Sequence, residues 1–74
     1  MDKSLEELLK RVSKLPYDSL SLFTYKFSTY ISEQAIDCSF QEKYPTAVYL
    51  IEAKDNLEMA ALYFKKAHNT IIRK

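Results

Sequence analysis

Hydrophobic residues recur at helical spacing in three segments of the chain, which Pro16 and Pro45 separate. The first segment spans residues 4–15, and its apolar residues fall on one face of a helix. These residues are Leu5, Leu8, Leu9, Val12 and Leu15. Ser4 and Glu7 have the spacing of a capping box, and Pro16 disfavours helical geometry at the residue before it. We therefore predict a short amphipathic helix in this segment.

The second segment also has a helical stripe, but it leaves a second interpretation open. A helix with Asp18 or Ser19 as its N-cap would run to about Asp37. Its stripe consists of Leu20, Phe23, Phe27, Tyr30 and Ile31. Residues 21–27 also alternate between apolar and polar, which is compatible with a strand. We favour the helix because no turn signal offers a hairpin partner for the backbone hydrogen bonds of a strand.

The third segment has the longest apolar stripe. Residues 38–44 are expected to form a loop closed by Pro45, and Thr46 then caps a helix that runs to Arg73. Its stripe keeps one face for about seven turns. The stripe consists of Ala47, Leu50, Ile51, Leu57, Ala60, Ala61, Phe64, Ala67 and Ile71. The small alanines would allow another helix to approach closely.

The lengths of the predicted helices indicate how they are arranged. The third helix would be about 40 Å long, whereas a compact globule of this chain length is only about 30 Å across. A second helix of about 19 residues cannot cover all of it. We therefore predict an all-α single domain over residues 1–74, with a short N-terminal helix followed by an elongated antiparallel α-hairpin. The uncovered apolar surface predicts a homo-oligomer that assembles through helix faces.

Composition excludes several classes of function. The 74 residues include 11 Lys and Arg against 10 Asp and Glu, so a net charge of +1 argues against a DNA-binding protein. The absence of glycine excludes phosphate-binding glycine loops. No stretch approaches the roughly 20 apolar residues of a membrane span, and the charged N-terminus does not resemble a signal peptide. With a single cysteine, Cys38, the sequence predicts a cytoplasmic protein without membrane contact.

No residue pattern predicts catalysis or metal binding. His68 and Cys38 have no motif that would make them a catalytic pair, so we interpret them as ordinary surface and loop residues. The acidic residues Glu52, Asp55 and Glu58 share one helical face, but the Glu-x-x-His element of bundle metal sites is missing. A solvated charged face is the simpler interpretation. We expect neither an enzyme nor a bound cofactor or metal.

Six tyrosines in 74 residues are the unusual feature of the composition. A tyrosine ring can stack on a planar ligand, and neighbouring lysines can neutralise phosphates. The candidate ligand-binding residues on this hypothesis are Tyr17, Tyr25, Lys26, Tyr63, Lys65 and Lys66. The alternative is that the tyrosines pack in the core or at a subunit contact.

Part of the third helix resembles a known family. The segment Leu57-Glu58-Met59-Ala60, followed by Tyr63 and by Lys66-Ala67, is similar to the hairpin domain of phage anti-CBASS and anti-Thoeris sponges. The resemblance covers about 25 residues. Tyr63 stands where that family usually has Trp, and Pro45-Thr46 replaces an Arg-Glu pair that often precedes its helix.

The resemblance implies a function, and a second class of function remains open. Sponges of this family are small, helical, non-catalytic oligomers that sequester cyclic nucleotide messengers of bacterial immunity in pockets between subunits. The resemblance thus implies a phage counter-defence protein in the host cytoplasm that binds a cyclic di- or trinucleotide. It assigns no ligand-binding residue, because the matched positions are packing residues. The alternative is a helical interaction module, such as an inhibitor, antitoxin-like or regulatory protein, that docks a protein partner through its apolar, tyrosine-rich face.

Overall fold

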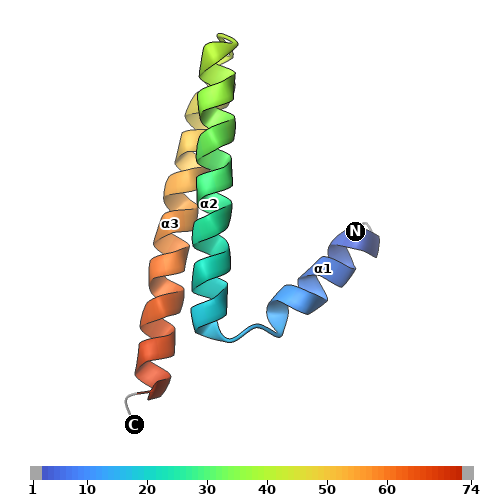
Figure 1. The fold of residues 1–74 in the computed structure, drawn as a ribbon, viewed down its shortest axis with the longest axis vertical. Coiled ribbons are helices and arrows are strands. Elements are labelled where there is room, and N and C mark those ends of the chain that lie inside the picture. The colour runs from blue at the N-terminus through green and yellow to red at the C-terminus, as the bar shows by residue number, and fades with distance from the viewer. Residues whose placement is uncertain (1–2, 73–74) are drawn as a thin grey trace.

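A computed structural model describes residues 3–72, and this part of the chain is all-helical, as predicted. Its elements in chain order are α1 (Lys3–Ser13), α2 (Tyr17–Phe40) and α3 (Tyr44–Ile72). Residues 21–27 lie within α2, so the strand interpretation is wrong. Helices α2 and α3 lie side by side and antiparallel, while α1 diverges from them (Figure 1).

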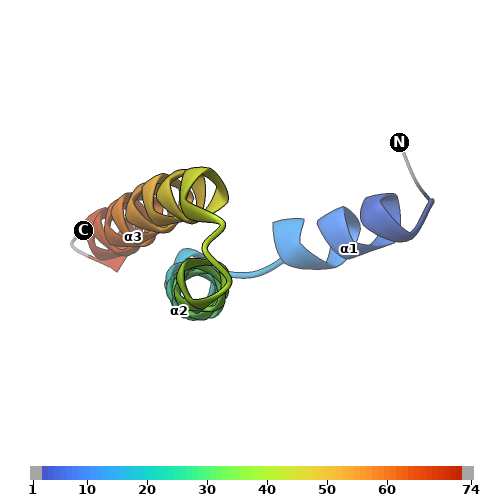
Figure 2. The same cartoon turned by 90° about the horizontal axis from the view of Figure 1, so that it is seen from above.

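The described part of the chain is elongated and flat, with extents of 50 × 31 × 14 Å. The 29 residues of α3 account for most of the long dimension, because an α-helix rises about 1.5 Å per residue. Seen along the hairpin, α1 extends from α2 on the side away from α3 (Figure 2). The hairpin therefore has only two layers, and most of its side chains remain at the surface.

The contact between α2 and α3 is a seam of mostly small residues. Its buried or half-buried positions alternate three and four apart, the spacing that keeps one helix face against another in coiled coils. On α2 these positions are Ser21, Thr24, Ser28, Ile31, Ala35 and Cys38. On α3 they are Ala47, Leu50, Lys54, Leu57, Ala61, Phe64 and His68. The fully buried members, such as Ala35, Ala47 and Ala61, have small side chains, which let the two helices approach closely.

The hydroxyl groups in the seam are satisfied by backbone carbonyls. Ser21 Oγ donates a hydrogen bond of 2.7 Å to the carbonyl oxygen of Ala61 and so joins the two helices directly. Thr24 Oγ1 donates to Leu20 O at 2.7 Å, and Ser28 Oγ donates to Tyr25 O within α2. These bonds remove the cost of burying unpaired hydroxyls, so serine and threonine can occupy positions where large apolar residues are usual.

The predicted apolar stripe of α2 is only partly correct. Ile31 is half-buried at the seam and Leu20 is half-buried beside it, but Phe23, Phe27 and Tyr30 are exposed. The face of α2 that packs on α3 instead has small residues at its fully buried positions, which are Thr24, Ser28 and Ala35.

The turn between the two long helices is shorter than predicted. Residues 38–40 belong to α2, and only residues 41–43 connect it to α3. Lys43 N–H bonds to Cys38 O at 2.8 Å and Glu42 N–H bonds to Ser39 O at 3.0 Å, the two bonds of a Schellman motif. Glu42 takes the left-handed conformation, with φ of 61°, that such a turn requires.

The predicted starts of α2 and α3 also need correction. Helix α2 begins at Tyr17, with an extended Pro16 as its N-cap, rather than after a cap at Asp18 or Ser19. Helix α3 begins at Tyr44 and contains Pro45 and Thr46 in its first turn. Proline is compatible with a first turn because the N–H that it lacks would have no partner within the helix. The predicted end at Arg73 lies outside the described residues.

Helix α1 is close to its predicted bounds but is not buried. It begins at Lys3, one residue before the predicted cap Ser4, and it ends at Ser13. None of its 11 residues is buried, although its apolar positions form the predicted stripe. Across residues 3–72, no helix is both long and apolar enough to cross a membrane.

The seam predicts that a larger residue at Ser28 destabilises the hairpin. Ser28 is only 1% exposed, so Ser28→Leu would force α2 and α3 apart and should cost about 1–3 kcal/mol. Thermal unfolding followed by circular dichroism at fixed protein concentration measures this loss. Ser39→Leu introduces the same side chain at an exposed position and should leave the midpoint nearly unchanged. Equal effects of the two substitutions would contradict a tightly packed seam.

The turn predicts a stabilising substitution. A left-handed conformation costs a non-glycine residue about 1–2 kcal/mol, whereas glycine pays a smaller penalty in unfolded-chain entropy. Glu42→Gly should therefore stabilise the hairpin by about 0.5–1 kcal/mol, measured as a higher midpoint of thermal unfolding. Glu42→Ala is the control that removes the charge but keeps the Cβ atom. If alanine stabilised the fold as much as glycine, backbone strain at this position would not be the cause.

Candidate functional site

An open groove of about 480 Å³ lies between the N-terminal half of α2 and the C-terminal half of α3. Its base includes the hydrogen bond between Ser21 Oγ and the carbonyl oxygen of Ala61. The other lining residues are Asp18, Leu22, Tyr25, Glu58, Leu62, Lys65 and His68. The groove thus combines apolar walls with an aromatic ring and ionisable groups of both signs.

The charges of this groove are nearly balanced. Asp18 Oδ2 lies 3.9 Å from His68 Nε2, which ties the start of α2 to the end of α3. Glu58 is drawn toward Lys54, with 3.2 Å between Oε1 and Nζ, and its carboxylate raises the pKa of the Lys54 ammonium above the usual value. Among the described residues, Lys65 forms no ion pair. The groove therefore offers one free ammonium group beside two carboxylates, which is not a strongly positive site.

A second groove of about 420 Å³ lies where the linker between α1 and α2 meets the end of α3. Its lining residues are Ser13, Leu15, Pro16, Tyr17, His68 and Ile71. Apart from His68 it contains no nitrogen base or charged side chain, so its character is mainly apolar. His68 lines both grooves, which places them next to each other at the open end of the hairpin.

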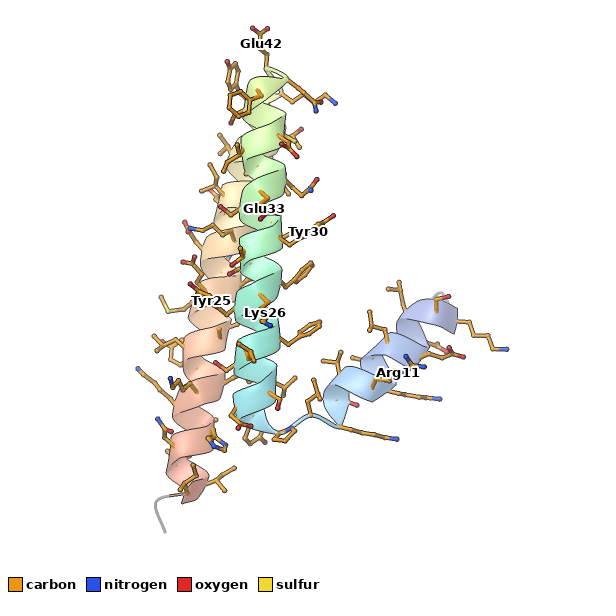
Figure 3. All side chains as sticks on the ribbon, viewed as in Figure 1. Arg11, Tyr25, Lys26, Tyr30, Glu33 and Glu42 are labelled. Carbon is orange, nitrogen blue, oxygen red and sulfur yellow. The ribbon has the colours of Figure 1, made fainter. Side chains whose placement is uncertain are left out.

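The structure distributes the predicted ligand-binding residues over several places. Tyr25 and Lys65 line the first groove, and Tyr17 lines the second. Lys26 lies on α2 outside both grooves (Figure 3). The remaining two residues, Tyr63 and Lys66, lie on α3 outside both grooves.

Tyr63 and Lys66 on α3 interact with each other. Lys66 Nζ stands 5.3 Å from the centre of the Tyr63 ring, within the range of a cation–π interaction. Of the predicted site, only Tyr25 and Lys65 share one concave surface.

Three neighbouring aromatic side chains, Phe23, Phe27 and Tyr30, form a ridge along the surface of α2. The ring centres of Phe23 and Phe27 are 6.5 Å apart, and those of Phe27 and Tyr30 are 6.2 Å apart. The three side chains are 44%, 45% and 53% exposed. Tyr30 points away from α3, toward the side of α2 on which α1 lies (Figure 3). We call these three residues the aromatic ridge.

A second apolar surface lies on α1. Leu5, Leu8 and Leu9 are 55%, 51% and 58% exposed, and they belong to the stripe that the sequence predicts for this helix. The sequence analysis identified both sets of residues as members of helical apolar stripes. The run of serine, threonine and alanine at seam spacing in α2 is the signal that would have located the ridge at the surface.

Two of the acidic residues considered for metal binding contact a lysine, since Asp55 Oδ1 and Glu58 Oε1 lie 3.5 and 3.2 Å from Lys54 Nζ. Within residues 3–72, no group of three or more His, Cys, Asp and Glu side chains is placed to hold a metal ion. Cys38 is half-buried at the turn end of the seam, not in a loop, whereas His68 lies toward the opposite end of the hairpin. These two residues do not form a catalytic pair in this structure.

Comparison of the chain with known protein families, curated proteins and solved structures finds no match.

Proposed function

We propose that this protein is a non-catalytic helical interaction module that binds an amphipathic helix on its aromatic ridge. The exposure of Phe23, Phe27 and Tyr30 is the observation that carries this proposal. Three adjacent aromatic rings at the surface are unusual because monomeric soluble proteins rarely expose large contiguous apolar patches. Aromatic residues are also enriched in the buried centres of protein interfaces.

The shape of the ridge favours a helical partner. Leu20, Phe23, Phe27 and Tyr30 repeat three and four residues apart, the spacing that presents one continuous row to a second helix. A helix that binds another protein uses such anchors on one face. The flanks of the row are polar, with Lys26 and Glu33 both exposed, as expected for the rim of an interface.

Cyclic nucleotide binding remains a second hypothesis, and one observation favours it. Tyr25 and Lys65 line the same groove, so a stacking ring and an ammonium group are available to one ligand. The carboxylates of Asp18 and Glu58 line that groove too and would repel phosphates. The ridge is therefore the better-supported binding surface.

A photo-reactive residue in the ridge tests the interaction module. Replacing Tyr30 with a photo-crosslinking phenylalanine analogue should produce discrete covalent adducts with a protein, either another copy or a different chain. Phe27→Lys should remove these adducts, because it places a charge in the centre of the ridge. Mass spectrometry of the products in expressing cells is the measurement.

The matched control introduces the same residue, lysine, at another exposed apolar position of α2. Ile36 is exposed and lies nine residues from Phe27, which places it half a turn away around α2. Ile36→Lys should leave the adducts unchanged. An absence of protein adducts, or an equal loss with both lysine variants, would overturn the proposed role of the ridge.

Native mass spectrometry with a panel of cyclic di- and trinucleotides tests the second hypothesis. Binding through the first groove should add the mass of an intact nucleotide, and Lys65→Glu should weaken it at least about tenfold by removing the free ammonium group. Lys26→Glu is the matched control, since Lys26 lies outside the groove. A protein that binds no member of the panel would exclude these messengers as its ligands.

A further inference from the structure

We infer that the helix bound by the aromatic ridge is α1 of a second copy of this chain, in a reciprocal dimer. This inference rests on the proposed function and names the partner of the same surface. Each copy would insert its α1 stripe onto the ridge of the other, so one dimer would contain two identical contacts. A two-fold dimer of this kind is the commonest form of self-association.

Helix α1 needs a partner to be stable. It has 11 residues, and isolated helices shorter than about 12–15 residues are marginal in water. In most proteins the stability of such a helix comes from packing of its apolar face. None of the α1 residues is buried in the single chain, so the surface that stabilises it must be supplied from outside this arrangement.

The two surfaces match in length and in spacing. Leu5, Leu8 and Val12 of α1 and Leu15 of the following linker are three, four and three apart, and the row from Leu20 to Tyr30 repeats the same intervals. Antiparallel packing would stack them in four layers, with Leu8 against Phe27 near the centre. Each row spans ten residues from first to last, or about 15 Å along a helix.

The structure holds α1 away from its own ridge. Pro16, with φ of −60° and ψ of 160°, extends the linker immediately before α2. Helix α1 consequently diverges from α2 on the side that Tyr30 faces (Figures 1 and 3). In this arrangement α1 does not pack along its own α2, so its stripe is free to meet the ridge of a second copy.

The surface available is sufficient for a dimer. The three leucines of α1 and the three rings of the ridge are each about half exposed. Two reciprocal contacts would bury roughly 1,200 Å² of side-chain surface, taking about 200 Å² per side chain, which reaches the lower end of stable protein interfaces. The second groove, formed partly by Leu15, would be adjacent to each contact.

Mixing two variants that each dimerise poorly on their own tests this arrangement. Leu8→Glu disables α1 and Phe27→Lys disables the ridge, so each variant alone should have a dimer dissociation constant more than about 100-fold above wild type, because both contacts lose an apolar layer. An equimolar mixture should form a heterodimer. One of its two contacts keeps Leu8 against Phe27, and the other pairs the introduced glutamate with the introduced lysine. Native mass spectrometry resolves the heterodimer by mass, and sedimentation velocity measures its affinity.

Each outcome decides the inference. Ile36→Lys is the control and should dimerise like wild type. A wild-type protein that stays at 8.7 kDa, variants that still dimerise, or a mixture that fails to form the heterodimer would overturn the inference. Folding of α1 onto its own ridge would give monomers that mixing does not change. If Tyr30 crosslinks a different protein while mixing produces no heterodimer, the ridge remains an interaction surface and only the assignment of α1 is wrong.

Discussion

Close approach of α2 and α3 is the constraint on which the rest of this structure depends. The buried positions of the hairpin hold alanine, serine and threonine, so little apolar surface is removed from water when the two helices pack. Van der Waals contact along the seam and backbone-directed hydrogen bonds, such as that from Ser21 to Ala61, hold the helices together. Because small residues occupy the fully buried positions, the large apolar residues are at most half-buried, and many of them are exposed.

This arrangement separates the folding of the hairpin from the use of its apolar residues. In most small domains the aromatic residues form the core and are unavailable for binding. Here Phe23, Phe27 and Tyr30 do not pack against α3, so a partner can cover them without any rearrangement of the hairpin. Pre-formed binding surfaces avoid the entropic cost of ordering a segment on association.

Sequence reasoning found the helices but not the orientation of α2. The spacing of Leu5, Leu8, Leu9 and Val12 was sufficient for α1, and the alanine-rich stripe was sufficient for α3. For α2 the stripe chosen was the most hydrophobic one, whereas packing selected the face with the smallest residues. Hydrophobicity alone cannot distinguish these faces, because the choice depends on how closely the partner helix approaches.

The residue types at the turn between α2 and α3 also led to wrong predictions of where these helices end and begin. The sequence suggested a loop at residues 38–44 that Pro45 closes, but Pro45 lies in the first turn of α3. The left-handed residue is Glu42, which has no intrinsic preference for that conformation. In a chain without glycine, the turn was therefore not recognisable from residue type. For the candidate site, only the tertiary packing brings Tyr25 and Lys65 into one groove, so their proximity does not follow from their positions in the sequence.

The three-residue turn has a consequence for how this chain can change in length. Its Schellman bonds fix the rotation of α3 about its own axis relative to α2. One deleted residue would change that rotation by about 100°, carrying Ala47 and Ala61 off the seam and bringing the bulkier Val48 and Leu62 onto it. Single-residue deletions should therefore be selected against between α2 and α3.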